Sequence, residues 1–160
     1  MSTGFLKMAL VLIGYSAALV VALMVTPSSS AAASCEPTKS DALGPFYEPN
    51  APERSSVGQG YILRGHVKSS RDCSAIEGAK IEFWLAGPNG QYDADHRATV
   101  ISGKAGSYRF ESNFPPSYSR RPPHIHIRVS AESYLALVTQ HYPVQGQTEA
   151  TFDLVLVPAP

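Results

Sequence analysis

The sequence lacks an excess of charge of either sign. Its 160 residues include 13 Lys and Arg and 13 Asp and Glu, so the formal net charge is zero. A chain without a net charge has no long-range attraction to nucleic acid or to anionic membrane surfaces. We therefore expect no nucleic-acid partner.

Long apolar runs are also scarce, and the clearest one lies at the N-terminus. Lys7 precedes an apolar run over 8–25, and a Pro, Ser and Ala tract ends at Ala33. This order is typical of an export signal over 1–33, with cleavage after Ala33. We expect a secreted, periplasmic or cell-surface protein. A run of roughly 18 residues can also span a bilayer, so an uncleaved membrane anchor is the alternative, and only then is a membrane contact expected.

Cysteine is nearly absent, with only Cys35 and Cys73 in the chain. There is no third Cys, and the two present are expected to be structural, so a thiolate zinc site is disfavoured. In an oxidising compartment the pair can form a disulfide, worth about 4 kcal/mol in the chain-entropy model. Two unpaired thiols remain the other interpretation.

Sustained helical periodicity is missing as well. Residues 34–60 are rich in Pro, Gly, Ser and charge, which predicts an extended N-terminal arm whose aromatic pair, Phe46 and Tyr47, docks on the domain. From 61 to 160 the sequence predicts an all-β domain of the β-sandwich type, because short β-type runs alternate with turn residues. The expected strands cover 61–67, 80–85, 98–102, 107–111, 124–130, 135–140 and 151–157.

The segment Pro122-Pro123-His124-Ile125-His126 carries the first chemical signal. Side chains alternate along a strand, so the two imidazoles share one face about 6 to 7 Å apart and can bind one metal. The prolines cannot donate ladder hydrogen bonds and mark an accessible edge. Taken alone, such a pair is more often two surface or hydrogen-bonded histidines than a metal site.

Two tyrosines are the candidates for further ligands. Tyr118 lies six residues before His124, and Tyr92 follows the Asn89-Gly90 turn. A trivalent cation at bonding distance favours the phenolate, and hard oxygens combined with imidazoles suit Fe(III) better than Zn(II) or Cu(I). The structural alternative for each tyrosine is half-buried packing.

An ordered set of motifs from 43 to 157 is specific to one family. It comprises Gly44-Pro45-Phe46-Tyr47, Ile76-Glu77-Gly78 through Trp84 to Gly90-Gln91-Tyr92, Gly106-Ser107-Tyr108-Arg109-Phe110, Pro116-Ser117-Tyr118, Arg121-Pro122-Pro123-His124-Ile125-His126 and Val138-Thr139-Gln140. This set resembles the intradiol ring-cleavage dioxygenases, which include catechol and protocatechuate 3,4-dioxygenases. The resemblance implies a prealbumin-like sandwich and one nonhaem Fe(III) per chain, held by Tyr92, Tyr118, His124 and His126.

The same resemblance implies a reaction. A small aromatic diol would bind as a dianion, Tyr118 would act as one of the bases that take its protons, and O₂ would cleave the ring between the two hydroxyl-bearing carbons. The product would be of the cis,cis-muconate type. Arg121 and Gln140 would hold the substrate and stabilise charge on its ring, and Tyr47 would line the pocket. From the residues alone, Arg121 could instead form a surface salt bridge and Tyr47 could pack on the sandwich.

Three further questions stay open at this stage. A noncatalytic, transthyretin-like module of the kind attached to carboxypeptidases is the alternative function, and a dioxygenase-like domain without activity is a third. The oligomeric state is also open, with a homo-oligomer as one outcome. The remaining conspicuous side chains are expected to be structural: surface His66, His96 and His141, core Trp84, and packing Tyr108 and Tyr142.

Overall fold

The computed structural model describes residues 35–160, so the expected export signal over 1–33 lies outside the described residues. Within 35–160 no helix has the length and apolar composition needed to cross a membrane. The short 3-10 helices are η1 (Ala94–His96) and η2 (Lys104–Gly106). The strands are β1 (Tyr61–Ser69), β2 (Lys80–Leu85), β3 (Arg97–Ile101), β4 (Ser107–Ser112), β5 (Ile125–Ser130), β6 (Leu137–His141), β7 (Glu149–Thr151) and β8 (Leu154–Leu156).

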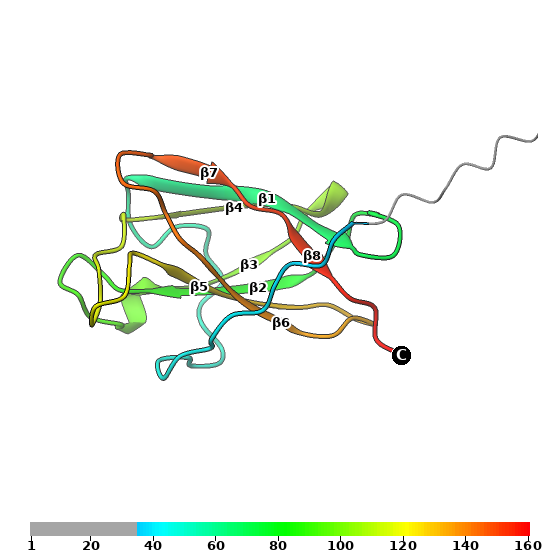
Figure 1. Ribbon diagram of the computed structural model, residues 1–160, viewed down its shortest axis with the longest axis horizontal. Coiled ribbons are helices and arrows are strands. Elements are labelled where there is room, and N and C mark those ends of the chain that lie inside the picture. The colour runs from blue at the N-terminus through cyan, green and yellow to red at the C-terminus, as the bar shows by residue number, and fades with distance from the viewer. Residues whose placement is uncertain (1–34) are drawn as a thin grey trace, which may run out of the picture. The chain divides into compact units, whose positions relative to one another are not determined.

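The strands form two sheets, which lie as two layers in Figure 1. One sheet has the order β4-β1-β7, with β8 also pairing β1, and the other has the order β3-β2-β5-β6. In the second sheet, called the site sheet below, Trp84 pairs with His126 and His126 pairs with Gln140. The predicted all-β sandwich is confirmed.

Alternate residues of the site sheet point inward and form the core. Ile81, Phe83 and Leu85 of β2 and Ile125 and Ile127 of β5 are all buried against the other sheet. The rings of Phe83 and Phe110 stack with centroids 4.2 Å apart. Each such side chain contributes about 1.5–3 kcal/mol when removed from water, so this face contributes strongly to the stability of the fold.

The intervening residues point to the outer face of the site sheet, yet they are buried too. Glu82, Trp84, His126 and Gln140 are each no more than 4% exposed. Trp84 is therefore buried as predicted, but not in the core between the sheets, where the sequence placed it. It lies on the outer face because β2 alternates, and Phe83 takes the inward position.

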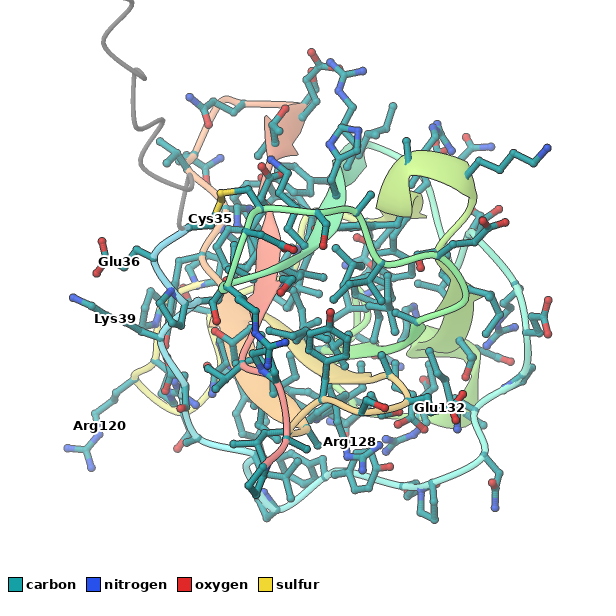
Figure 2. All side chains as sticks on the ribbon, turned by 90° about the vertical axis from the view of Figure 1, so that its right-hand side faces the viewer. Cys35, Glu36, Lys39, Arg120, Arg128 and Glu132 are labelled. Carbon is teal, nitrogen blue, oxygen red and sulfur yellow. A yellow bond between two sulfur atoms is a disulfide. The ribbon has the colours of Figure 1, made fainter. Side chains whose placement is uncertain are left out.

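The outer face is covered by the arm, residues 35–57, which contains no regular strand. The arm is held by backbone bonds from Thr38 N to Val155 O (3.1 Å) and from Asp41 N to Val138 O (2.9 Å). A disulfide joins Cys35 to Cys73 in the loop after β1, visible as the yellow bond in Figure 2. The predicted docking of the arm's aromatic pair is confirmed, since Tyr47 packs edge-on against Trp84.

The prediction of one continuous strand over 151–157 is wrong, because two short strands, β7 and β8, occupy this part of the chain. Phe152 and Asp153 interrupt it where Gly65 of β1 approaches so closely that a Cβ would lie 2.2 Å from Phe152 O. The Asp153 carboxylate accepts the bond from His66 N (2.9 Å) that a ladder carbonyl would otherwise accept. The other predicted strands exist, and their ends differ from the predicted ones by no more than two residues.

Candidate metal centre

The four residues predicted as ligands come from three segments. Tyr92 lies in the loop after β2 and Tyr118 in the loop after β4, while His124 directly precedes β5 and His126 is its second residue. Ring centroids are 5.4 Å apart for Tyr92 and Tyr118, 5.9 Å for Tyr92 and His126, and 4.8 Å for His124 and His126. The fold thus brings two phenols and two imidazoles into one cluster on the outer face of the site sheet.

The tautomer of His124 is set by its backbone neighbour. Its Nδ1 lies 2.7 Å from Pro122 O, and since a carbonyl only accepts, Nδ1 carries the hydrogen. The lone pair is then on Nε2, which lies 2.9 Å from the Tyr92 hydroxyl. Burial lowers the pKa of His124, and burial followed by the neighbouring His124 lowers that of His126 to about 4. Both imidazoles are neutral at neutral pH, which is the form that binds metals.

Tyr92 is held in place by the arm and by an arginine. Its ring stacks on Phe46 with centroids 4.5 Å apart, and Arg97 donates to the backbone oxygens of Phe46 and Tyr92. Burial raises the pKa of Tyr92 to about 12. The phenol therefore keeps its proton unless a cation binds beside it.

His126 is enclosed on two sides. Its ring stacks on Trp84 with centroids 4.9 Å apart and planes 5° apart. On the arm side is Gly44, whose φ is +73° and where a Cβ would lie 3.0 Å from His126 Cε1. Glycine suits both the positive φ and the close approach. The buried Nδ1 of His126 has no hydrogen-bond partner among the described residues, and such an orphaned atom is expected where a bound group completes a site.

The donor set decides which metal the cluster fits. Residues 35–160 contain no group of three or more His, Cys, Asp or Glu side chains arranged to hold a metal ion. A metal here therefore depends on the two tyrosine oxygens in addition to the imidazoles. Hard phenolate oxygens with neutral imidazoles fit Fe(III) by ligand hardness, and no thiolate is available for a softer ion.

A two-residue turn places Arg121 beside Tyr118. Tyr118 N donates to Arg121 O (3.2 Å), and Arg121 N donates to Tyr118 O (2.8 Å). Between them Ser119 and Arg120 have φ of 44° and 65°, the left-handed pair of a type I′ turn, although neither is glycine. Figure 2 shows the Arg120 side chain pointing away from the domain. The tight turn explains how so short a segment connects Tyr118 with His124.

The residues predicted to hold substrate also meet. Arg121 Nη2 donates to Gln140 Oε1 over 2.7 Å, and Gln140 lies opposite His126 in the strand register. Sequence reasoning missed Tyr142, which it assigned to packing, and Asp41. Tyr142 Oη lies 3.1 Å from Arg121 Nη2 and donates to Asp41 Oδ2 over 2.7 Å. Tyr142 follows Gln140 by two residues, and in an extended chain this spacing places both side chains on the same face, which could have indicated its role.

Tyr47 is further from the cluster. Its hydroxyl donates to Glu82, 3.2 Å from Oε2, and Trp84 lies between its ring and that of His126. Burial, followed by the Glu82 charge, raises the pKa of Tyr47. A substrate contact at Tyr47 stays a prediction.

Two of the three surface histidines are wrongly predicted. His141 points into the sandwich, where Tyr61 Oη lies 2.7 Å from its Nε2. The residue was expected on the surface because it is opposite Gln140, but the opposite face is the core side of β6. His96 is half-buried, with Nδ1 2.6 Å from Asp93. His66 is exposed, as predicted.

Comparison with known proteins identifies the relatives of the chain. No family model matches the sequence. Catechol 1,2-dioxygenase of Candida albicans is 32% identical over 145 residues, covering 68% of this chain and 48% of that protein. Intradiol ring-cleavage dioxygenase prcA of Aspergillus niger is 27% identical over 143 residues, covering 67% and 45%. The chain spans about half the length of these curated relatives.

A solved structure covers more of the fold. The dioxygenase domain of a dioxygenase carbohydrate-binding protein fusion from Streptomyces sp. SirexAA-E is 27% identical, with a TM-score of 0.70. The match covers 78% of this chain and 100% of that domain. By sequence and by fold, the chain is related to the intradiol ring-cleavage dioxygenases.

Proposed function

We propose that the chain is a nonhaem ferric dioxygenase that cleaves the ring of a catechol-type aromatic between its two hydroxyl-bearing carbons. The observation that carries the proposal is the convergence of Tyr92, Tyr118, His124 and His126 on the outer face of the site sheet. Relatives named catechol 1,2-dioxygenase and hydroxyquinol 1,2-dioxygenase support it. The noncatalytic, transthyretin-like alternative is not favoured by these relatives.

The four side chains would hold one Fe(III) per chain. When bound, the ion supplies Lewis acidity and a template that orients the two diol oxygens. Its charge also offsets the burial that raises the pKa of Tyr92. The bond from His124 Nδ1 to Pro122 O keeps Nε2 available as a ligand atom.

Arg121 is the cation positioned to donate hydrogen bonds to the negatively charged substrate. Its Nη2 donates to Gln140 and Tyr142, and within residues 35–160 its Nε and Nη1 have no hydrogen-bond acceptor. These two nitrogens are free to donate to an anionic diol or to charge developing on its ring, and preorganised donors contribute most in a site shielded from water. Phe46 and Trp84 provide that shielding beside Tyr92 and His126.

Tyr118 is the candidate base for the diol. It lies at the rim with its ring packed against Phe46 and Tyr92. A bound cation would favour its phenolate, with the phenol proton released to solvent, and the phenolate oxygen could then take a proton from a hydroxyl of the substrate. The same turn carries Arg121, because the backbones of Tyr118 and Arg121 are bridged.

We also propose that the domain acts outside the cytoplasm. The disulfide between Cys35 and Cys73 supports this, because such bonds persist in oxidising compartments. The export signal expected over 1–33 supports the same location.

To test this, iron-loaded protein is incubated separately with catechol, protocatechuate and hydroxyquinol. Oxygen uptake is measured and the product is identified. We expect one O₂ consumed per ring and a cis,cis-muconate-type product from at least one substrate. His124→Ala should lose the reaction, and His66→Ala, a matched histidine on the other sheet, should retain it. No oxygen uptake with any substrate, or a semialdehyde from cleavage beside the hydroxyl pair, would contradict the proposal.

A further inference from the structure

A network of polar side chains extends from Arg121 to the N-terminal arm. Arg121 Nη2 contacts Gln140 Oε1 (2.7 Å) and Tyr142 Oη (3.1 Å). Tyr142 Oη contacts Asp41 Oδ2 (2.7 Å) and also lies 3.1 Å from Gln140 Oε1. Asp41 and Tyr142 are 101 residues apart in sequence, so the fold alone brings them together.

The number of hydrogens on the Tyr142 hydroxyl and on Arg121 Nη2 determines which group donates each hydrogen bond. The Tyr142 hydroxyl has one hydrogen, and the Asp41 carboxylate is both the nearest and the only charged acceptor, so the hydrogen goes there. The hydroxyl oxygen then accepts from Arg121. Both hydrogens of Arg121 Nη2 are thus used, one for Gln140 and one for Tyr142. The position of the guanidinium is fixed on one edge, and its Nε and Nη1 remain for a ligand.

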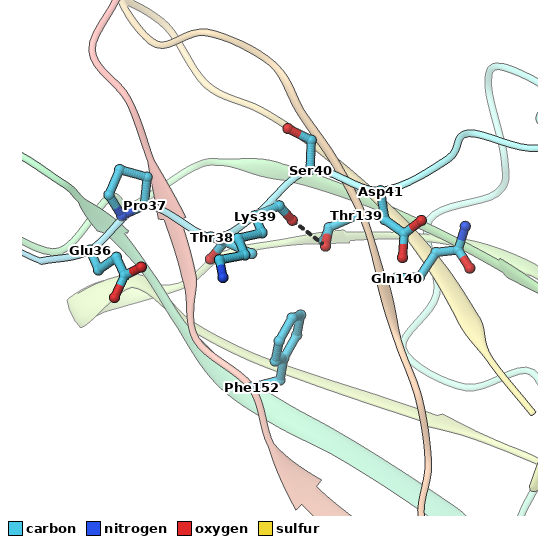
Figure 3. Close-up of a pocket in the computed structure, with 9 residues that line it drawn as sticks. All are labelled: Glu36, Pro37, Thr38, Lys39, Ser40, Asp41, Thr139, Gln140 and Phe152. Atoms are coloured by element: carbon cyan, nitrogen blue, oxygen red, sulfur yellow. Dashed lines mark hydrogen bonds between the residues drawn. The ribbon is translucent and has the colours of Figure 1, made fainter.

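Gln140 is oriented by the neighbouring arm residue. Its Nε2 donates to Ala42 O, which fixes Oε1 as the atom that faces Arg121. In Figure 3 the Asp41 and Gln140 side chains lie together at one end of a groove of about 500 Å³ between the arm and β6. Two consecutive arm residues, Asp41 and Ala42, therefore hold the two partners of Arg121.

We propose that Asp41 and Tyr142 are positioning residues that orient the Arg121 guanidinium toward the substrate, so that the arm is part of the active site. The inference rests on the proposed function, in which Arg121 meets the charge of the diol. An arginine held on one edge loses little further rotamer freedom when substrate binds, and its dipoles need little reorganisation during reaction. Asp41 acts through Tyr142 and contacts no reacting atom.

A merely structural role for the Asp41–Tyr142 bond would be to tether the arm. The arm has other anchors, however. Thr38 exchanges bonds with Val155, Asp41 N donates to Val138 O, and Thr139 Oγ1 donates to Lys39 O. None of these bonds involves the Tyr142 hydroxyl, so its removal should leave the arm in place and release only Arg121.

The test is a double-mutant cycle in the iron-loaded full chain with Tyr142→Phe, Asp41→Asn and both together. Each single variant should lower kcat/KM for the preferred diol about tenfold, the size expected for one hydrogen bond to a charged group. The double variant should be no slower than Tyr142→Phe, because Asp41 acts through the hydroxyl. Asp41→Glu should recover part of the rate, and Glu36→Gln, which removes another exposed arm carboxylate, should match the wild type.

A second readout does not depend on activity. The Arg121 Nε–H signal in a nitrogen-15 NMR spectrum should be a single resolved line in the wild type and should broaden in Tyr142→Phe, with an unchanged unfolding midpoint. Independent, multiplied losses in the double variant, or an unchanged Arg121 signal in Tyr142→Phe, would overturn the proposal. A wild type that binds iron but does not cleave any diol would instead count against the proposed function, and the NMR result would still decide the role of Tyr142.

Discussion

The two faces of the site sheet are equally buried but serve different purposes. Phe83 on the inner face is 1% exposed and its neighbour Trp84 on the outer face is 2% exposed. The inner face is covered by a second sheet and is apolar except in β6, where His141 points inward, whereas the outer face is covered by an irregular arm and carries histidine, glutamine and glutamate. Burial alone therefore does not separate core from site. The two faces are distinguished by the element that covers them and by the polarity of the side chains buried beneath it.

Polar groups under the arm need partners, and Glu82 shows how they are provided. Burial alone would raise the pKa of this carboxyl, but hydrogen bonds from Lys80 and Arg128 lower it. Tyr47 from the arm adds a further donor. The charges around Glu82 are thus paired, whereas Trp84 Nε1, Arg97 Nε and His126 Nδ1 on the same face have no hydrogen-bond partner among residues 35–160. The stability of this face depends on which side chains remain paired.

The largest expected effect comes from truncating the inner face. Phe83→Ala should lower the free energy of unfolding by about 3–5 kcal/mol, since it leaves a cavity beside Phe110. The matched outer-face change, His126→Gln, should cost about 1 kcal/mol but abolish iron binding. Urea unfolding and iron content measured on both variants check this pair. Similar stability losses from the two would show that the faces are not distinct.

A smaller effect is expected from His141, a titratable group on the inner face. Burial lowers its pKa to about 4, whereas the ordinary value is 6.5. The unfolded chain takes up the proton first, so His141 destabilises the fold as pH falls from about 6.5 to about 4, by about 3 kcal/mol in total. His141→Gln keeps an acceptor for Tyr61 Oη and should flatten the loss of stability in this window. An unchanged slope of unfolding free energy against pH would show that His141 does not titrate as described.

The smallest effect concerns the turn that connects the site residues. Ser119→Asn combined with Arg120→Gly supplies the residues that type I′ turns prefer and should raise the free energy of unfolding by about 0.5–1 kcal/mol. The reaction rate should stay near that of the wild type, because the backbone bonds between Tyr118 and Arg121 are kept. Arg120→Val is the opposite control, since a β-branched residue is strained at positive φ. A stabilised turn with lost activity would assign Ser119 or Arg120 a direct role.

The strands and the cluster could be expected from sequence because their signals are local. Alternation in β2 and β5 separates Phe83 from Trp84 and Ile125 from His126, and the four candidate ligands sit in ordered motifs. The contacts that complete the site are distant in sequence, such as Gln140 with Ala42 at a separation of 98 residues. Nothing in the local pattern of the arm indicates which strand it covers, so Asp41 was missed. Alternation places His141 opposite Gln140 but does not show which face of β6 is the core side, so its inward position was missed too.

The most direct test of the metal centre is a titration of the protein with Fe(III), followed by visible absorption. Tyrosinate bound to Fe(III) absorbs in the visible range, so we expect a burgundy band that saturates at one iron per chain. Tyr118→Phe should weaken the band and His124→Ala should abolish it. A protein that binds iron and stays colourless, or an unchanged band in both variants, would contradict the assignment of Tyr92, Tyr118, His124 and His126 as ligands.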